Sequence, residues 1–240
     1  MPLFIYCEDT SSLVSHEEIA LSKRESHHLL VLREHNGTNT VAFDGLGNIR
    51  QGILKRKNYN TYVQFTQSVE HCKIPLPHVS LVQVLPNEPA TFESILKKSC
   101  ELGVYAIYPI LGECTEHKRW TQDIWHCKRE RFRRIMVDAC KQAKNPILPT
   151  LSSEIHTFHN IPWTSFNQRF YGSLLPSKSI KKVTINATTK SIACAIGPEG
   201  GFSPEEEKLL SMHAQPMRLC PYVLRVETAT VSALACLRNL

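Results

Sequence analysis

Short runs of β-type residues, separated by turn residues, dominate the first third of the chain. The runs TVAFDG, NIRQGILKRKN and TYVQFTQSV are predicted strands because each contains β-branched or aromatic residues and is bounded by HNG, DGLGN or KNYN. Only SKRESHHLLVLRE is typical of a helix there. We therefore predict a small, mostly β domain of barrel size over residues 1–72, followed by a proline-bearing linker, KIPLP, at residues 73–77.

From residue 78 onwards, apolar strands alternate with helices. The predicted strands are HVSLVQVL, VYAIYPIL, RFYGSLL, SIACAIG and PMRLC. Between the first two, apolar residues follow helical spacing from Phe92 to Leu102, and Gly103 is placed as the C-terminal stop. This alternation is typical of an α/β domain with a largely parallel sheet, which we place at residues 78–240.

The basic excess of the chain is concentrated in one segment. The formal net charge is +6, and residues 117–144 alone contain nine basic and three acidic residues. In a helix over this segment, an apolar stripe leaves the basic side chains on or near the exposed side, among them Lys128, Arg129, Arg133 and Arg134. Such a surface is either merely solvated or binds phosphate groups.

Composition excludes several other classes of protein. At 240 residues and 42% hydrophobic, the chain is long enough to bury a full core. It has no signal-peptide pattern and no window of about 18 apolar residues that would span a bilayer, so we expect a cytoplasmic protein without a membrane partner. The nine cysteines are scattered without CxxC pairs or zinc-ligand spacing, so no metal site is expected.

A glycine-rich loop leads from the run SIACAIG into a helix start, with the sequence IGPEGGFSPEEE at residues 196–207. Ser203 is placed as the N-cap and Pro204 as the first helical residue, while Glu206 completes a capping box. The loop therefore ends at a well-defined helix N-terminus, where free N–H groups usually attract anions.

The residues around that helix start argue against a phosphate ligand. The glycine spacing matches neither the dinucleotide fingerprint nor the P-loop, and the glutamates at 205–207 would repel a phosphate. Glycines let the backbone approach a flat ligand closely, and the negative charge of Glu199 would suit a cation. S-adenosylmethionine combines a nucleoside, a sulfonium and no phosphate. The alternative is a plain strand-to-helix turn.

The segment LRVETATVSAL, taken together with IGPEGGFSPEE, resembles the ribosomal RNA small subunit methyltransferase E family, which methylates N3 of a uracil in 16S rRNA. The similarity extends to LREHNGTNTVAFDG, ESILKKSCELGVYAIYPI and RRIMVDACKQAKNPILP. It implies an N-terminal PUA-like β-barrel and a C-terminal α/β domain of the SPOUT type. That domain would contain a trefoil knot, bind S-adenosylmethionine and form a homodimer.

The resemblance also implies site residues. The expected cofactor-binding residues are Leu175, Pro176, Ile196, Gly197, Glu199, Gly200, Gly201, Leu219, Cys220, Val223 and Leu224. Arg225 is the expected catalytic cation, because its guanidinium would stabilise the charge that spreads onto the uracil oxygens when N3 loses its proton. Glu227 would hold that guanidinium or accept the proton; alternatively, the two residues form a structural ion pair at the dimer interface.

An RNA substrate favours phosphate binding by the basic helix. Trp120 and Trp125 beside it either stack on bases or pack in the core. We therefore expect a homodimeric methyltransferase that acts on 16S rRNA or the small ribosomal subunit. Two alternatives stay open: a noncatalytic RNA-binding or ribosome-assembly factor, and a SPOUT methyltransferase with a different nucleotide target.

Overall fold

The chain folds into two compact units. The structure is a computed structural model that describes residues 2–57, 60–174, 178–179 and 184–239. The first unit comprises Met1–Ile74 and Cys140–Leu148, and the second comprises Pro75–Ala139 and Pro149–Leu240. The second domain expected at residues 78–240 is therefore interrupted by a segment that belongs to the first unit.

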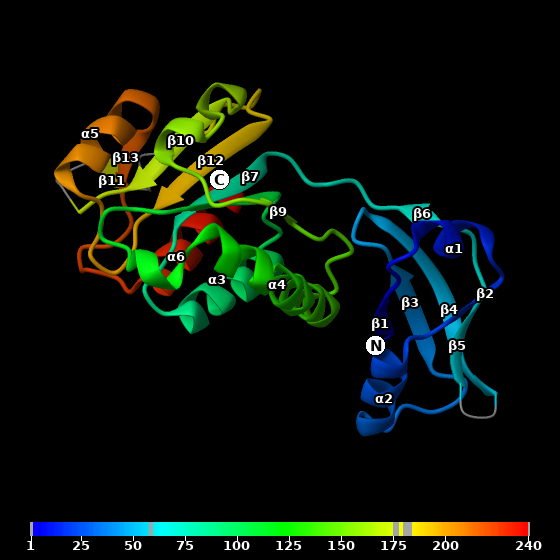
Figure 1. Ribbon diagram of the computed structural model, residues 1–240. Helices are drawn as coiled ribbons and strands as arrows, with labels where there is room; N and C mark the ends of the chain where they lie inside the picture. Colours follow the sequence, from blue (N-terminus) through cyan, green and yellow to red (C-terminus); the bar gives the residue numbers. More distant parts are fainter. Residues whose placement is uncertain (1, 58–59, 175–177, 180–183, 240) are drawn as a thin grey trace. The chain divides into compact units, whose positions relative to one another are not determined.

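The first unit is built on a six-stranded sheet (Figure 1). Its strands are β1 (Leu3–Tyr6), β2 (Glu18–Ala20), β3 (Asn39–Phe43), β4 (Asn48–Lys57), β5 (Asn60–Phe65) and β6 (Glu70–His71). The order is β1-β3-β4-β5-β2, with β6 beside β4; β1 and β3 pair parallel and the other pairs are antiparallel. The three strands predicted from the sequence are β3, β4 and β5, whereas β1, β2 and β6 were not predicted.

The barrel expected for this unit is not found. No strand pairing among the described residues joins β1 to β2, so the sheet has two ends. Two helices accompany it: α1 (Thr10–Ser15) and α2 (Lys23–Val31), of which only α2 was predicted. The core of the unit gathers buried apolar side chains from the strands and both helices, among them Ile5, Leu13, Leu29, Leu54 and Val63.

The second unit is built on a seven-stranded sheet in which every pair of neighbours is parallel. Its strands are β7 (His78–Val84), β8 (Ala106–Ile110), β9 (Thr150–Leu151), β10 (Gln168–Gly172), β11 (Lys178–Ser179), β12 (Ser191–Ile196) and β13 (Gln215–Arg218). Their order is β11-β13-β10-β12-β7-β8-β9. The predicted parallel α/β sheet is confirmed.

Helices connect these strands. The α-helices are α3 (Pro89–Glu101), α4 (Gln122–Ala143), α5 (Pro204–His213) and α6 (Val226–Arg238), and the 3-10 helices are η1 (His117–Arg119), η2 (Phe158–Asn160) and η3 (Trp163–Ser165). Helix α3 ends as predicted, with Gly103 at φ +66°. None of the described helices combines the length and the apolarity needed to cross a membrane.

The sheet of the second unit has a core on each face. Since successive strand residues point to opposite faces, Val82 and Val84 of β7 point to the same side as Ala193 and Ala195 of β12. There they pack against α5, through Leu210, and against η2 and η3. Helices α3 and α6 pack together on the sheet (Figure 1). Because the strands are parallel, the loops after β10, β12 and β13 meet at one edge, where α/β proteins bind ligands.

Candidate functional site

A cavity of about 330 Å³ lies at the carboxyl ends of β10, β12 and β13. Its walls come from residues 172–174, 196–202, 218–220 and 222–224, completed by Glu207 of α5 and by Val226 and Ala229 of α6. The volume is in the range of small-molecule sites, roughly 300–1,000 Å³. Three loops that are distant in the sequence therefore form one site.

The predicted cofactor residues converge on this cavity. Those that line it are Ile196, Gly197, Glu199, Gly200, Gly201, Leu219, Cys220, Val223 and Leu224. Leu175 and Pro176 lie outside the described residues. The lining also includes Ser173 and Glu207, which sequence reasoning did not assign to the site. The run of glutamates at 205–207 is visible in the sequence, but the pattern does not indicate that Glu207 is the one that lines the cavity.

The helix start after the loop has the predicted capping box. The Ser203 hydroxyl accepts a hydrogen bond from the Glu206 N–H (3.1 Å), and Oε2 of Glu206 accepts one from the Ser203 N–H (2.8 Å). Glu206 is buried, and its Oε1 also accepts the N–H of Glu113 (2.8 Å). Its carboxylate is thus a structural group that connects α5 to the segment after β8. Of the three glutamates predicted to repel a phosphate, Glu207 is the one that lines the cavity.

We call residues 197–201 the glycine loop. Two of its glycines are explained by backbone conformation or by packing within the protein, without reference to a ligand. Gly201 has φ +75°, a conformation that favours glycine, and its N–H donates to the Pro198 carbonyl (3.0 Å). A Cβ on Gly200 would lie 3.1 Å from Cβ of Cys114 and 3.4 Å from its Sγ. Whereas the sequence pattern predicts only close approach of a ligand at these glycines, Gly200 lines the cavity and also has a protein neighbour, Cys114.

The polar side chains of the cavity are arranged unfavourably for a phosphate. Glu207 accepts a hydrogen bond from the Ser173 hydroxyl (3.0 Å). Burial, and secondarily the negative charge of Glu207, raise the pKa of the nearby Tyr171. The Arg218 guanidinium donates to the carbonyls of Cys220 (3.2 Å) and Pro221 (2.8 Å), so it shapes its own loop.

A buried polar network connects elements that contribute Ile196 and Val226 to the cavity lining. The Gln83 amide nitrogen donates to the carbonyls of Val84 (2.8 Å) and Ile196 (3.3 Å), and its oxygen lies 2.9 Å from the Thr230 hydroxyl. Gln83 and Thr230 are fully buried. Since unpaired polar groups are costly in the core, these bonds hold β7, the end of β12 and α6 in one arrangement.

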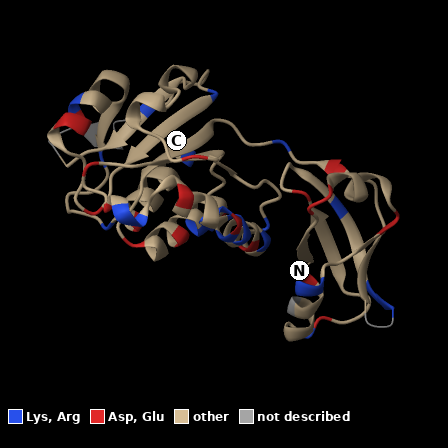
Figure 2. Cartoon of the chain, viewed as in Figure 1, with Lys and Arg blue, Asp and Glu red and all other residues tan. Residues whose placement is uncertain are grey.

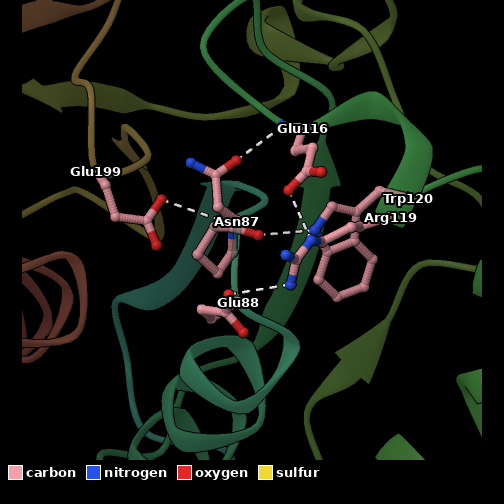
Figure 3. Close-up of polar contacts among 7 residues, drawn as sticks. Asn87, Glu88, Glu116, Arg119, Trp120 and Glu199 are labelled. Atoms are coloured by element: carbon pink, nitrogen blue, oxygen red, sulfur yellow. Dashed lines mark hydrogen bonds and ion pairs between the residues drawn. The ribbon is translucent and has the colours of Figure 1, made fainter.

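The carboxylate of Glu199 accepts a hydrogen bond from a residue that does not line the cavity. Its Oε2 accepts a hydrogen bond from the N–H of Asn87 (3.0 Å), a residue in the loop between β7 and α3. Figure 3 shows this contact beside an arginine-centred cluster. Arg119 pairs with Glu116 (2.6 Å) and Glu88 (3.0 Å).

The expected catalytic pair lies at the start of α6. Arg225 is the N-cap residue, and its side chain is exposed; Glu227 is half-buried in the first turn. In the part of the chain that the structure describes, no ion pair joins them, and neither is among the residues lining the cavity. Their catalytic roles stay predictions.

Basic and acidic residues are interspersed along α4 (Figure 2). Of the four residues predicted to bind RNA, Arg129 and Arg134 are exposed and Lys128 and Arg133 are half-buried. Arg134 pairs with Glu130 one turn away (3.1 Å), which is a weak interaction at the surface. The Lys128 ammonium lies 5.4 Å from the centre of the Trp120 ring. The surface is therefore less purely basic than the charge count indicated.

Trp120, just before this helix, and Trp125, within it, belong to the core, so the core-packing alternative is confirmed and stacking on bases is excluded. Trp120 and Trp125 are fully buried with Phe92 and Phe132. The indole N–H of Trp120 donates to the Pro86 carbonyl (2.7 Å), and that of Trp125 donates to the Ser153 carbonyl (3.1 Å). Each ring thus has a full set of protein partners. Separately, the described residues contain no group of three metal-ligating side chains.

Comparison with known proteins identifies the family. A family model described as an RNA methyltransferase domain matches residues 72–238. The ribosomal RNA small subunit methyltransferase E of Aquifex aeolicus (strain VF5) is 30% identical over 171 residues, which cover 70% of this chain and 71% of that protein. The chain belongs to the ribosomal RNA small subunit methyltransferase E family. The resemblance inferred from the GPEGG and LRVET segments is confirmed.

Solved structures agree with this family assignment over the whole chain. A Legionella pneumophila protein in complex with the bound cofactor S-adenosylmethionine is 27% identical, with a TM-score of 0.85, and the match covers 100% of this chain and 98% of that one. A methyltransferase E of Neisseria gonorrhoeae bound to S-adenosylmethionine has a TM-score of 0.83 at 24% identity, with the same coverage. The family fold therefore extends over both units.

Proposed function

We propose that this chain is an S-adenosylmethionine-dependent methyltransferase that modifies N3 of a uracil in the 16S rRNA of the small ribosomal subunit. The observation that carries the proposal is the convergence of the loops after β10, β12 and β13 on one cavity. The Legionella relative, with S-adenosylmethionine bound, supports this choice of cofactor.

The residues of the cavity fit this cofactor. Its lining combines apolar side chains, such as Leu219 and Leu224, with backbone groups of the glycine loop and the carboxylate of Glu207. A flat nucleoside with a cationic sulfonium suits such a site, whereas a phosphate would meet Glu207 and no unengaged basic side chain among the described lining residues. When bound, S-adenosylmethionine supplies an electrophilic methyl group.

Arg225 is the residue we assign to transition-state stabilisation. Uracil N3 is a poor nucleophile until its proton leaves, and the resulting charge spreads onto the two flanking carbonyl oxygens. A guanidinium is always charged and presents a planar fork of donors, which suits those oxygens. Its exposed position at the α6 N-cap, directly after cavity residues Val223 and Leu224, allows it to meet a base that enters from solution. Glu227 holds the guanidinium or accepts the proton.

The remaining parts of the proposal concern RNA and assembly. The α4 surface, chiefly Arg129 and Arg134, binds phosphates of the substrate. The first unit, as a PUA-like domain, helps to position the RNA substrate. The protein acts in the cytoplasm. The second unit forms the trefoil knot and the homodimer that the family resemblance implies.

Single-turnover transfer of a labelled methyl group from S-adenosylmethionine to small ribosomal subunits tests the proposal. We expect Arg225→Ala and Arg225→Lys to bind the donor normally yet lose on the order of 10²-fold in the chemical step, because a point charge does not replace the fork. Near-normal transfer by the alanine variant would remove Arg225 from catalysis. Donor binding by the wild-type protein without any transfer would favour the RNA-binding or assembly factor.

A further inference from the structure

We propose that Glu199 is a positioning residue whose carboxylate latches the glycine loop to the segment after β7, instead of supplying charge to the sulfonium of the ligand. The inference rests on the proposed function for the identity of that ligand. It assigns the family's GPEGG glutamate in this chain a role in loop geometry, which the pattern of charges did not indicate.

The direction of the side chain is the first observation. Figure 3 shows Glu199 extending from its loop towards Asn87, and Oε2 accepts the Asn87 N–H at 3.0 Å. Asn87 is not among the residues that line the cavity. The carboxylate is therefore bonded to a group outside the lining, although Glu199 itself contributes to the wall.

The partner of this bond is itself held in place. The Glu116 N–H donates to Oδ1 of Asn87 (2.7 Å), and Arg119 bridges Glu116 and Glu88. The neighbouring Pro86 carbonyl accepts the indole N–H of a buried tryptophan at 2.7 Å. The segment to which Glu199 is bonded is thus fixed from the β8–α4 connection, and it provides a firm anchor.

A second contact attaches the same loop to neighbouring segments. Gly200 packs so closely on Cys114, which lies after β8, that a Cβ would approach it to 3.1 Å. Glu199 and Gly200 therefore connect consecutive positions of the loop to the segments after β7 and β8. These contacts leave the backbone of the loop to form the cavity wall.

Calorimetry with two ligands separates the latch from a direct charge contact. S-adenosylhomocysteine lacks the sulfonium charge, so a carboxylate that acts on this charge discriminates between the two ligands. We expect Glu199→Gln, which keeps an oxygen acceptor for Asn87, to bind both ligands within about twofold of wild type, and Glu199→Ala to weaken both by about fivefold. Glu205→Gln, which removes an exposed carboxylate outside this cavity, is the matched control. Weakening of S-adenosylmethionine alone by Glu199→Gln would overturn the proposal.

Amide hydrogen exchange without ligand keeps the latch testable if the proposed cofactor does not bind. We expect residues 197–201 to exchange faster in Glu199→Ala than in wild type, while Glu199→Gln and Glu205→Gln resemble wild type. Unchanged exchange in the alanine variant would refute the latch. Failure of the wild-type protein to bind either ligand would instead refute the proposed function.

Discussion

Gly200→Ala is expected to weaken donor binding through a contact inside the protein. The new Cβ would lie 3.1 Å from Cβ of Cys114, whereas carbon atoms pack best at about 3.5–4.0 Å. The glycine loop has to retreat by a few tenths of an ångström, and binding has to reverse that shift. We estimate a cost of about 1 kcal/mol, at the low end for overpacking, which corresponds to roughly fivefold in donor affinity.

Removal of the neighbouring side chain distinguishes this mechanism from a clash with the ligand. Cys114→Gly deletes both atoms that the new methyl group meets, so the double variant should recover most of the affinity lost by Gly200→Ala. Gly201→Ala is the matched control, because this position has open space around it but φ +75°. Its backbone strain, about 1–2 kcal/mol, should not respond to Cys114→Gly.

Titration calorimetry of the four combinations of Gly200→Ala and Cys114→Gly measures the coupling. If Gly200→Ala weakens binding equally in both backgrounds, the glycine is needed for approach of the ligand and the packing argument is wrong. For the control, Gly201→Ala is expected to weaken donor binding equally with and without Cys114→Gly.

Three further predictions concern stability and RNA binding. Thr230→Val should lower the free energy of unfolding by about 1–3 kcal/mol in urea denaturation, because it leaves the buried Gln83 oxygen without its donor; an unchanged midpoint would contradict the network. Arg129→Glu combined with Arg134→Glu should flatten the slope of log affinity against log salt for RNA by roughly 0.7–0.9 per lost contact. An unchanged slope would mean that the basic residues of α4 are only solvated and bind no phosphate. Hydrogen bonds from the Ser11 and Ser12 hydroxyls lower the pKa of Asp9 to about 2. Because this pKa is depressed in the folded state, the stabilisation is complete above the ordinary value of about 3.9 and is lost as the pH falls towards 2; a carboxyl NMR titration of Asp9 near its ordinary value would be the contrary result.

Local patterns predicted the elements whose signals are local. The central strands β7, β8 and β12 of the parallel sheet are largely apolar runs, and the capping box at Ser203 depends on residues three positions apart. In contrast, β2, β6 and β9 have three residues or fewer, too few to show a period. Contacts with residues far away in the sequence form these short strands.

The same distinction applies to the site. The sequence identified segments that line the cavity, because the GPEGG and LRVET motifs are contiguous. It did not predict that Glu199 is bonded to Asn87, 112 positions earlier, or that Gly200 packs on Cys114. It also left the burial of Trp120 open, since its indole partner, the Pro86 carbonyl, is 34 positions away. Such pairs are set by the order of strands in the sheet, which no local period contains.

Primer extension on 16S rRNA tests the proposed activity most directly. Small ribosomal subunits are incubated with the protein, with and without S-adenosylmethionine, and the extracted rRNA is copied by reverse transcriptase. A methyl group on uracil N3 blocks Watson–Crick pairing, so the account predicts a new stop at one uracil that depends on both protein and donor. The absence of any such stop, or labelled methyl in the rRNA without a stop at a uracil, would contradict it.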